Sequence, residues 1–475
     1  MKKGLIIASG LLCAAPLYAA EAAGHGDPVA PILLVLLLIS IGAAFGGKWM
    51  RQVGQPAVLG ELLIGMVVAN LAYAWGEPVI TVIREGETIR AIIEHALTTG
   101  ASAADAARQL LPDTEQTRRL AEILGSSAGQ VAIASYQFVD LLSRIAVIVL
   151  LFLVGLETSY HEMRKVGGPA LAVAIVGVVL PFVLGVAVMK LLMPEAPLAK
   201  DIFIGAILTA TSVGITARVF RDLGASKKDE ARIILGAAVI DDVLGLIVLA
   251  VVSGLVVTGT ISLASIAAIT AKSALFLFGS IGLGVWLAPR LVRRVARMNI
   301  ENHKLLFGLG FAFFLGWLAN VAGLATIVGA FAAGLILEEF FLEEFKGQSL
   351  RELLSPIESL IVPVFFVLMG IQVKLETFAD TRVIWMAAAL TVCAIIGKVA
   401  AGYVCSGKLN RLAIGLGMMP RGEVGLIFAS IGKGLGVVND AVFSAVVIMV
   451  MVTTLLTPPL LKITLGPGKA TKAAA

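Results

Sequence analysis

Long apolar segments recur along the whole chain, and they constrain the fold more than any other feature of the sequence. A helix that crosses a bilayer needs about 20 mostly apolar residues, because it rises 1.5 Å per residue through a hydrocarbon core of about 30 Å. The sequence therefore predicts an all-α polytopic membrane protein with about 13 transmembrane helices. The predicted spans cover residues 31–49, 57–75, 139–156, 168–193, 201–220, 230–256, 264–289, 304–319, 323–340, 356–373, 383–404, 412–432 and 440–462.

Composition excludes the soluble classes of protein. Charged residues make up 15% of the 475 residues and hydrophobic residues 59%, whereas a soluble domain carries about 25% charged residues. Too few charges are present to cover a soluble particle of this size, so we expect the partner to be the lipid bilayer and not a nucleic acid. The chain also holds no P-loop, HExxH or dinucleotide-binding motif, which argues against an enzyme and against a bound cofactor.

The first 20 residues have the pattern of a secretory signal peptide. Met1, Lys2 and Lys3 form a basic start, and the apolar run over residues 5–17 is too short to span a bilayer. We expect residues 1–20 to be cleaved, which leaves the mature N-terminus outside the cytoplasm. An uncleaved extra helix is the alternative.

If the first of the thirteen spans begins outside the cytoplasm, the last one ends in the cytoplasm. Residues 466–475 are then a short cytoplasmic tail. Basic residues favour this orientation, because cytoplasmic loops of membrane proteins carry the excess of Lys and Arg. A loop predicted inside holds Arg290, Arg293 and Arg294. We therefore predict a multi-pass protein of the bacterial inner membrane. The short loops predicted outside hold only Lys200, Lys374, Arg382 and Lys433.

One segment interrupts the apolar pattern. Residues 77–135 are polar, and the orientation above places them outside the cytoplasm. Two or three amphipathic helical pieces are expected within this insert, such as residues 88–96 and 103–111. A spacer or a partner-contact element is the interpretation that we prefer.

Two adjacent carboxylates lie inside an apolar span. Asp241 and Asp242 fall about 13 residues into the segment that starts near Asp229, and so near the middle of the hydrocarbon core. Each aspartate costs about 2.5–3.5 kcal/mol at that depth on the insertion scale. Adjacent helical residues do not face each other, so one carboxylate can point into a cavity while the other meets a partner.

Three further ionisable residues inside the spans are candidate charge partners: Lys398, Arg421 and Glu423. Together with the two aspartates they sum to one net negative charge, which a bound alkali cation or a proton can neutralise. Intramembrane charges usually mark an ion pathway. The alternative is a set of structural ion pairs that only lock helices together.

Two spans contain residues that weaken a helix. Residues 208–216 are rich in Thr, Ser and Gly, and residues 419–422 combine Pro with Gly. Irregular backbone at membrane depth survives only when it is buried in protein or lines a cavity. Secondary transporters place paired discontinuous helices of this kind at the midplane. We therefore predict an inverted repeat with two crossing discontinuous helices, although glycine can equally serve close helix packing.

Seven short motifs follow one another within residues 30–465. In these motifs the chain resembles the second family of monovalent cation:proton antiporters, which includes bacterial sodium/proton exchangers and potassium efflux systems. The resemblance implies that residues 30–465 form one exchanger membrane domain. The motifs cover residues 54–62, 151–157, 210–218, 240–242, 329–334, 363–370 and 420–426.

The resemblance also implies a homodimer, with a core domain and a dimerisation domain in each subunit. It implies an ion site at Asp241 and Asp242, an unwound helix at Thr211 and Ser212, and an intramembrane lysine at Lys398. The Asp-Asp form resembles the sodium/proton exchangers that move net charge. The signal-like N-terminus and the polar insert depart from the family pattern.

The resemblance implies a secondary active antiporter for pH homeostasis that exchanges protons for Na⁺ or Li⁺ by alternating access, and the buried charges favour the same interpretation. A carboxylate at Asp242 can hold a proton or an alkali cation, and oxygen ligands near Thr211 and Ser212 suit such a hard cation. Asp241 is expected to pair with Lys398 when no ion is bound. K⁺/H⁺ exchange and an ion-gated channel or sensor are the alternatives that the sequence leaves open.

Overall fold

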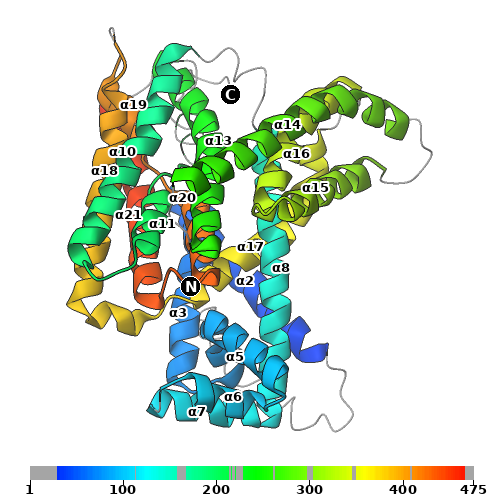
Figure 1. Cartoon of the computed structure of the whole chain (residues 1–475), viewed down its shortest axis with the longest axis vertical. Coiled ribbons are helices and arrows are strands. Elements are labelled where there is room, and N and C mark those ends of the chain that lie inside the picture. The colour runs from blue at the N-terminus through cyan, green and yellow to red at the C-terminus, as the bar shows by residue number, and fades with distance from the viewer. Residues whose placement is uncertain are drawn as a thin grey trace. The chain divides into compact units, whose positions relative to one another are not determined.

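The computed structural model describes most of the chain between its two termini. The described residues form α-helices and one short 3-10 helix, with no strand among them (Figure 1). The predicted signal peptide and the predicted C-terminal tail lie outside the described residues. The described residues are 29–112, 114–157, 167–212, 216, 220, 228–259, 263–296, 303–344, 349–406 and 409–465.

The helix boundaries agree with the apolar segments of the sequence. Every predicted span overlaps a helix, and nine helices in the described part of the chain are long and apolar enough to cross a membrane. The fold is therefore that of an all-α polytopic membrane protein. The helices are α2 (Ala30–Gln52), α3 (Ala57–Ala74), α4 (Pro78–Arg84), α5 (Gly86–Thr99), α6 (Ala103–Leu110), α7 (Glu115–Gly125), α8 (Ser127–Glu157), α10 (Gly168–Leu192), α11 (Leu198–Ile207), α13 (Asp229–Thr258), α14 (Leu263–Ala296), α15 (His303–Val321), α16 (Thr326–Glu344), α17 (Leu350–Ile371), η1 (Leu375–Ala379), α18 (Thr381–Gly402), α19 (Arg411–Gly417), α20 (Gly422–Gly434) and α21 (Asp440–Leu465).

The polar insert contains more helix than the sequence pattern predicts. It forms four helices, α4 to α7, and its last residues belong to α8, which begins at Ser127 and not near residue 139. Polar side chains do not by themselves prevent a helix, and residues 127–157 contain no proline. The helix α8 therefore begins before the predicted span. Side-chain oxygens of Glu77, Ser102 and Thr114 accept backbone N–H groups and cap α4, α6 and α7.

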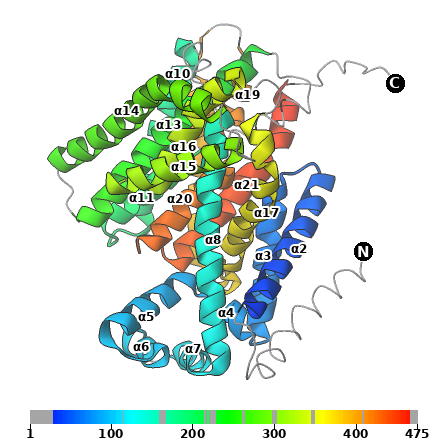
Figure 2. The ribbon, with the colours of Figure 1, turned by 90° about the vertical axis from the view of Figure 1, so that its right-hand side faces the viewer.

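The chain divides into two compact units. The first comprises residues 1–146 and 359–379, and the second comprises residues 147–358 and 380–475. In the first unit, α2 packs against α3, and the helices α4 to α7 pack among themselves (Figure 2). The α2–α3 contact is unusually close, because glycines at residues 46 and 60 let the two backbones meet.

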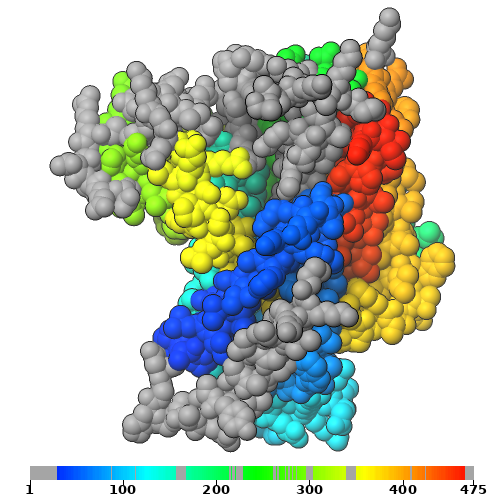
Figure 3. Space-filling view, turned by 180° about the vertical axis from the view of Figure 1, so that it is seen from behind, coloured from blue at the N-terminus to red at the C-terminus, as the bar shows by residue number. Residues whose placement is uncertain are grey.

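The second unit holds the helices with interrupted or charged spans. α10 packs against α11, α13 and α18, while α21 packs against α18, α19 and α20. The neighbouring α18 and α21 run along one face of this unit (Figures 1 and 3). A second group within the unit consists of α14, α15 and α16.

Large apolar side chains are exposed along whole helices. On α2 they recur at every fourth residue, and this helix, in dark blue, lies on the face seen in Figure 3. Soluble proteins rarely expose an apolar stripe of this length, so lipid is the natural solvent of this surface. The exposed residues of α2 are Leu33, Leu37, Ile41, Phe45 and Trp49.

The close α2–α3 contact predicts a strong effect of one methyl group. A Cβ on Gly60 would lie 1.9 Å from the carbonyl oxygen of Gly46, so Gly60→Ala must displace a backbone and is expected to cost about 1–3 kcal/mol. Thermal unfolding of the purified protein in detergent measures this loss. Gly42→Ala is the control, because its Cβ would meet only Ile64 at an ordinary 3.8 Å. An equal melting temperature for the two variants would contradict the packing.

Candidate ion site

The paired aspartates lie near the middle of α13. This 30-residue helix begins with acidic residues in its first turn, which suit the positive end of the helix dipole. Asp241 is 1% exposed and Asp242 is 7% exposed. Both carboxylates are therefore held away from solvent at the centre of a long apolar helix.

Lys398 reaches one of these carboxylates from α18. Its Nζ donates a hydrogen bond of 2.8 Å to Oδ1 of Asp241, and the side chain is fully buried. The charge of Lys398 also acts on Asp242. The structure therefore brings together Lys398 and Asp241, two residues that lie 157 positions apart in the chain.

The first interrupted span is α11. The helix ends at Ile207, and residues 210–212 have no regular structure. The Thr209 hydroxyl donates to the carbonyl of Ala206, which is the kind of local side-chain bond that competes with helix continuation. Thr211 and Ser212 follow and are both buried.

The second interrupted span consists of α19 and α20. α19 ends at Gly417, and α20 begins at Gly422. Pro420 lacks a backbone N–H and disfavours helical geometry at the preceding residue. Gly422 has a φ of 41°, a left-handed value that favours glycine. Both interruptions thus occur where the sequence predicts them.

The two interruptions contact each other directly. The backbone N–H of Ser212 donates to the carbonyl of Pro420 at 2.8 Å. The Thr211 hydroxyl donates to the carbonyl of Met418 at 3.4 Å, and the Thr216 hydroxyl to that of Gly417 at 2.7 Å. Each interruption therefore satisfies backbone groups that the other one leaves without a helical partner.

Arg421 lies at this crossing and is fully buried. Its guanidinium donates to the carbonyl of Ala210, in the first interruption, and to the carbonyl of Ala394, on α18, at 3.2 Å. The positive charge also acts on Asp241. For Glu423, the other candidate charge partner, the side chain lies outside the described residues.

Two threonines that were not predicted as ion-site residues also belong to the crossing. Thr454 on α21 accepts the backbone N–H of Gly422 at 3.4 Å, and Thr216 binds Gly417 as described above. The sequence gives only a weak indication that Thr454 belongs to the site. Thr454 belongs to a set of buried hydroxyls on an apolar helix, with Thr453 and Thr457, and such residues commonly bond only to their own helix.

The site offers oxygen atoms and little else to a cation. Within the residues that the structure describes, no group of three or more His, Cys, Asp or Glu side chains can hold a metal ion. A cation at Asp242 would need backbone carbonyls and hydroxyls to complete its shell, which suits an alkali ion. Interrupted helices that cross beside buried carboxylates are the arrangement of secondary ion transporters.

Comparison with known proteins identifies the family. The profile described as sodium/hydrogen exchanger, transmembrane, matches residues 33–465. The chain therefore belongs to the sodium/hydrogen exchanger family of monovalent cation:proton antiporters, as the motifs predict. This is a family of transporters and not of enzymes.

Two relatives match over nearly their full length. The high-affinity Na⁺/H⁺ antiporter NhaS3 of Synechocystis is 38% identical over 442 residues, which cover 91% of this chain and 90% of that protein. The Na⁺/H⁺-K⁺ antiporter GerN of Bacillus cereus is 30% identical over 444 residues, which cover 92% and 97% of the two chains.

A solved structure has the same fold. The sodium proton antiporter MjNhaP1 from Methanocaldococcus jannaschii aligns with a TM-score of 0.62 over 93% of this chain and 100% of that chain. At 14% identity, this likeness concerns the fold alone.

The buried ion pair predicts how stability depends on Lys398. Lys398→Ala leaves a buried carboxylate without its cation, which is expected to cost about 3–5 kcal/mol and to lower the unfolding temperature in detergent. The double variant Asp241→Asn with Lys398→Ala should recover most of the loss, because asparagine carries no charge. Lys190→Ala, which removes an exposed lysine on α10, is the control. A double variant less stable than Lys398→Ala would argue against the pairing.

Proposed function

We propose that this protein exchanges protons for monovalent cations across the membrane by alternating access, with Na⁺ and Li⁺ as the preferred cations. One observation carries the proposal: two adjacent buried carboxylates, one of them bonded to a buried lysine, lie on the helix that packs against both crossing segments. The names of the two relatives, both antiporters of Na⁺ and H⁺, support this substrate class.

The exchange follows from competition for one carboxylate. Asp242 holds either a proton or a partly dehydrated alkali cation, because one buried negative charge can neutralise only one of them. Thr211, Ser212 and nearby carbonyls supply further oxygen ligands. The cation weakens the attraction between Asp241 and Lys398, so the two aspartates titrate as a coupled unit. Transport then depends on pH without a separate sensor.

K⁺/H⁺ exchange is the second candidate, and the name of GerN, which includes K⁺, favours keeping it. The oxygen ligands proposed here suit both ions, and the choice between them depends on cavity size. Counterflow in liposomes with Na⁺, Li⁺ and K⁺ at several pH values separates the two. A gated channel or sensor would instead give flux without tight coupling to protons.

The cellular setting is part of the same proposal. We place the protein in the bacterial inner membrane as a homodimer, with residues 30–465 as the exchanger domain of each subunit. Cleavage of residues 1–20 leaves the N-terminus outside, and the tail from residue 466 lies in the cytoplasm. Such an exchanger serves pH homeostasis.

Asp242→Asn is expected to abolish exchange, because the amide can neither release a proton nor neutralise a cation. ΔpH-driven Na⁺ exchange in proteoliposomes measures this. Glu195→Gln is the matched control, since Glu195 is an exposed carboxylate in the loop between α10 and α11. Retained exchange in Asp242→Asn would overturn the role proposed for this residue.

Lys398→Ala is expected to impair exchange and to make the remaining transport less electrogenic, because Asp241 loses the positive charge that pairs with it when no cation is bound. Imposed membrane potentials in the same proteoliposomes report the net charge moved per cycle. A transport stoichiometry equal to that of the unmodified protein would refute the role of the pair in the cycle.

A further inference from the structure

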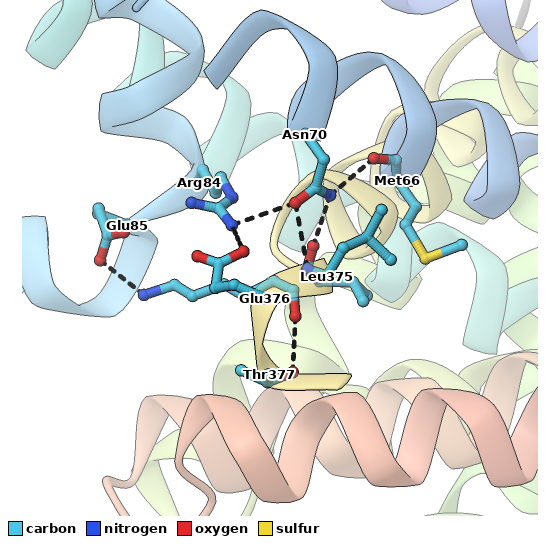
Figure 4. Close-up of polar contacts among 9 residues, drawn as sticks. Met66, Asn70, Arg84, Glu85, Leu375, Glu376 and Thr377 are labelled. Carbon is cyan, nitrogen blue, oxygen red and sulfur yellow. Dashed lines mark hydrogen bonds and ion pairs between the residues drawn. The ribbon is translucent and has the colours of Figure 1, made fainter. Parts of the chain in front are cut away.

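A polar cluster in the first unit joins the start of the insert to the segment that leads from α17 to α18. Figure 4 shows Arg84 at the end of α4, Asn70 on α3 and Glu376 in the η1 helix. Arg84 is fully buried, forms an ion pair with Glu376, and donates to Oδ1 of Asn70 at 3.1 Å. Its guanidinium also lies 3.9 Å from the centre of the Tyr73 ring.

Asn70 connects this arginine to the backbone of the same segment. Its Nδ2 donates to the carbonyl of Val373 at 2.8 Å, and its Oδ1 accepts the N–H of Leu375 at 3.1 Å. Both ends of one amide side chain therefore hold residues 373–375 against α3 (Figure 4).

A second ion pair holds the segment to the insert. Lys374 Nζ donates to Glu85 at 2.8 Å, and the two side chains are only 15% and 18% exposed. Gln372 lies so close to Gly86 that a Cβ on this glycine would be 2.7 Å from its amide nitrogen. Residues 372–376 are thus held by the side chains of Asn70 on α3, Arg84 on α4 and Glu85 between α4 and α5.

The position of this segment in the chain gives the cluster its importance. The chain passes between the two units at residues 146/147, 358/359 and 379/380. The first two passages lie inside the continuous helices α8 and α17, whereas the third lies between η1 and α18. α18 carries Lys398, so the fixed segment ends just before the helix that supplies the lysine of the ion site.

We propose that Arg84, Asn70 and Glu85 are positioning residues that hold residues 372–376 in place, so that α18 moves from a fixed starting point during the transport cycle. The inference rests on the proposed alternating access. It also assigns a role to the beginning of the polar insert, which acts through the connection to α18 and does not touch the ion. Loss of the attachment should slow the conformational step and leave cation binding unchanged.

Charge reversal of the second ion pair tests this proposal. Glu85→Lys and Lys374→Glu each place like charges together, and each should lower the maximal exchange rate about fivefold, which corresponds to about 1 kcal/mol in the barrier. The Michaelis constant for Na⁺ should not change. The double variant E85K/K374E restores the attraction and should restore the rate. Arg108→Gln is the control, because the Arg108–Asp105 pair is exposed and lies elsewhere in the insert.

Arg84 provides an independent measurement. Arg84→Gln should reduce the maximal rate with an unchanged Michaelis constant, and Arg84→Lys, which keeps the charge, should recover part of it. Size-exclusion profiles and melting temperatures establish that each variant is folded. A purely structural role would lower stability and leave the rate of the folded variants unchanged.

Three results would overturn the inference. These are a double reversal no faster than its single parents, folded single variants with the unmodified rate, and an effect confined to the Michaelis constant. Failure of the proposed function looks different: the unmodified protein would show no exchange, or Asp242→Asn would still exchange. The two outcomes are therefore distinguishable in one set of proteoliposomes.

Discussion

The structure depends on keeping charged and polar groups satisfied where no water can reach them. A carboxylate or an unpaired carbonyl inside a bilayer has no solvent partner, so the protein itself must supply one. In the second unit, two interrupted helices cross and supply partners to each other. The backbone N–H of Ser212 donates to the carbonyl of Pro420, and the Arg421 guanidinium donates to the carbonyl of Ala210. Lys398 completes the arrangement by bonding to Asp241.

The parts of the candidate site are held in different ways. The interrupted backbones are held by bonds to each other, and the aspartates are held by α13, a continuous helix. In the exchange that we propose, it is the charge of the aspartates that changes. Adjacent acids on one helix face different directions. Asp241 can therefore contact Lys398, while Asp242 is left for the competition between a proton and a cation that we propose.

The polar insert is held by two kinds of contact, those within it and those with residues 372–376. Three of its four helices begin with capping side chains, and the helices pack with one another. Its contacts with residues 372–376, in contrast, depend on a buried arginine and a half-buried ion pair. Such groups are costly to bury without partners, so they tie the insert firmly to the connection before α18.

The amino-acid sequence alone determined the all-helical membrane fold, the presence of a helix at each predicted span, both interruptions and the burial of the paired aspartates, because the bilayer imposes a length and a polarity on every helix that crosses it. The sequence pattern underestimated the helices of the insert, because its polar residues do not form the long apolar segments that mark a span. The sequence also led us to expect that Lys398 pairs with Asp241, and the structure contains this bond. Only the tertiary structure decided that Arg421 donates to the carbonyl of Ala210 and that the Thr454 hydroxyl accepts the N–H of Gly422. These partners lie far apart in the chain, and their meeting depends on how each helix is rotated and packed, which no local pattern of residues encodes.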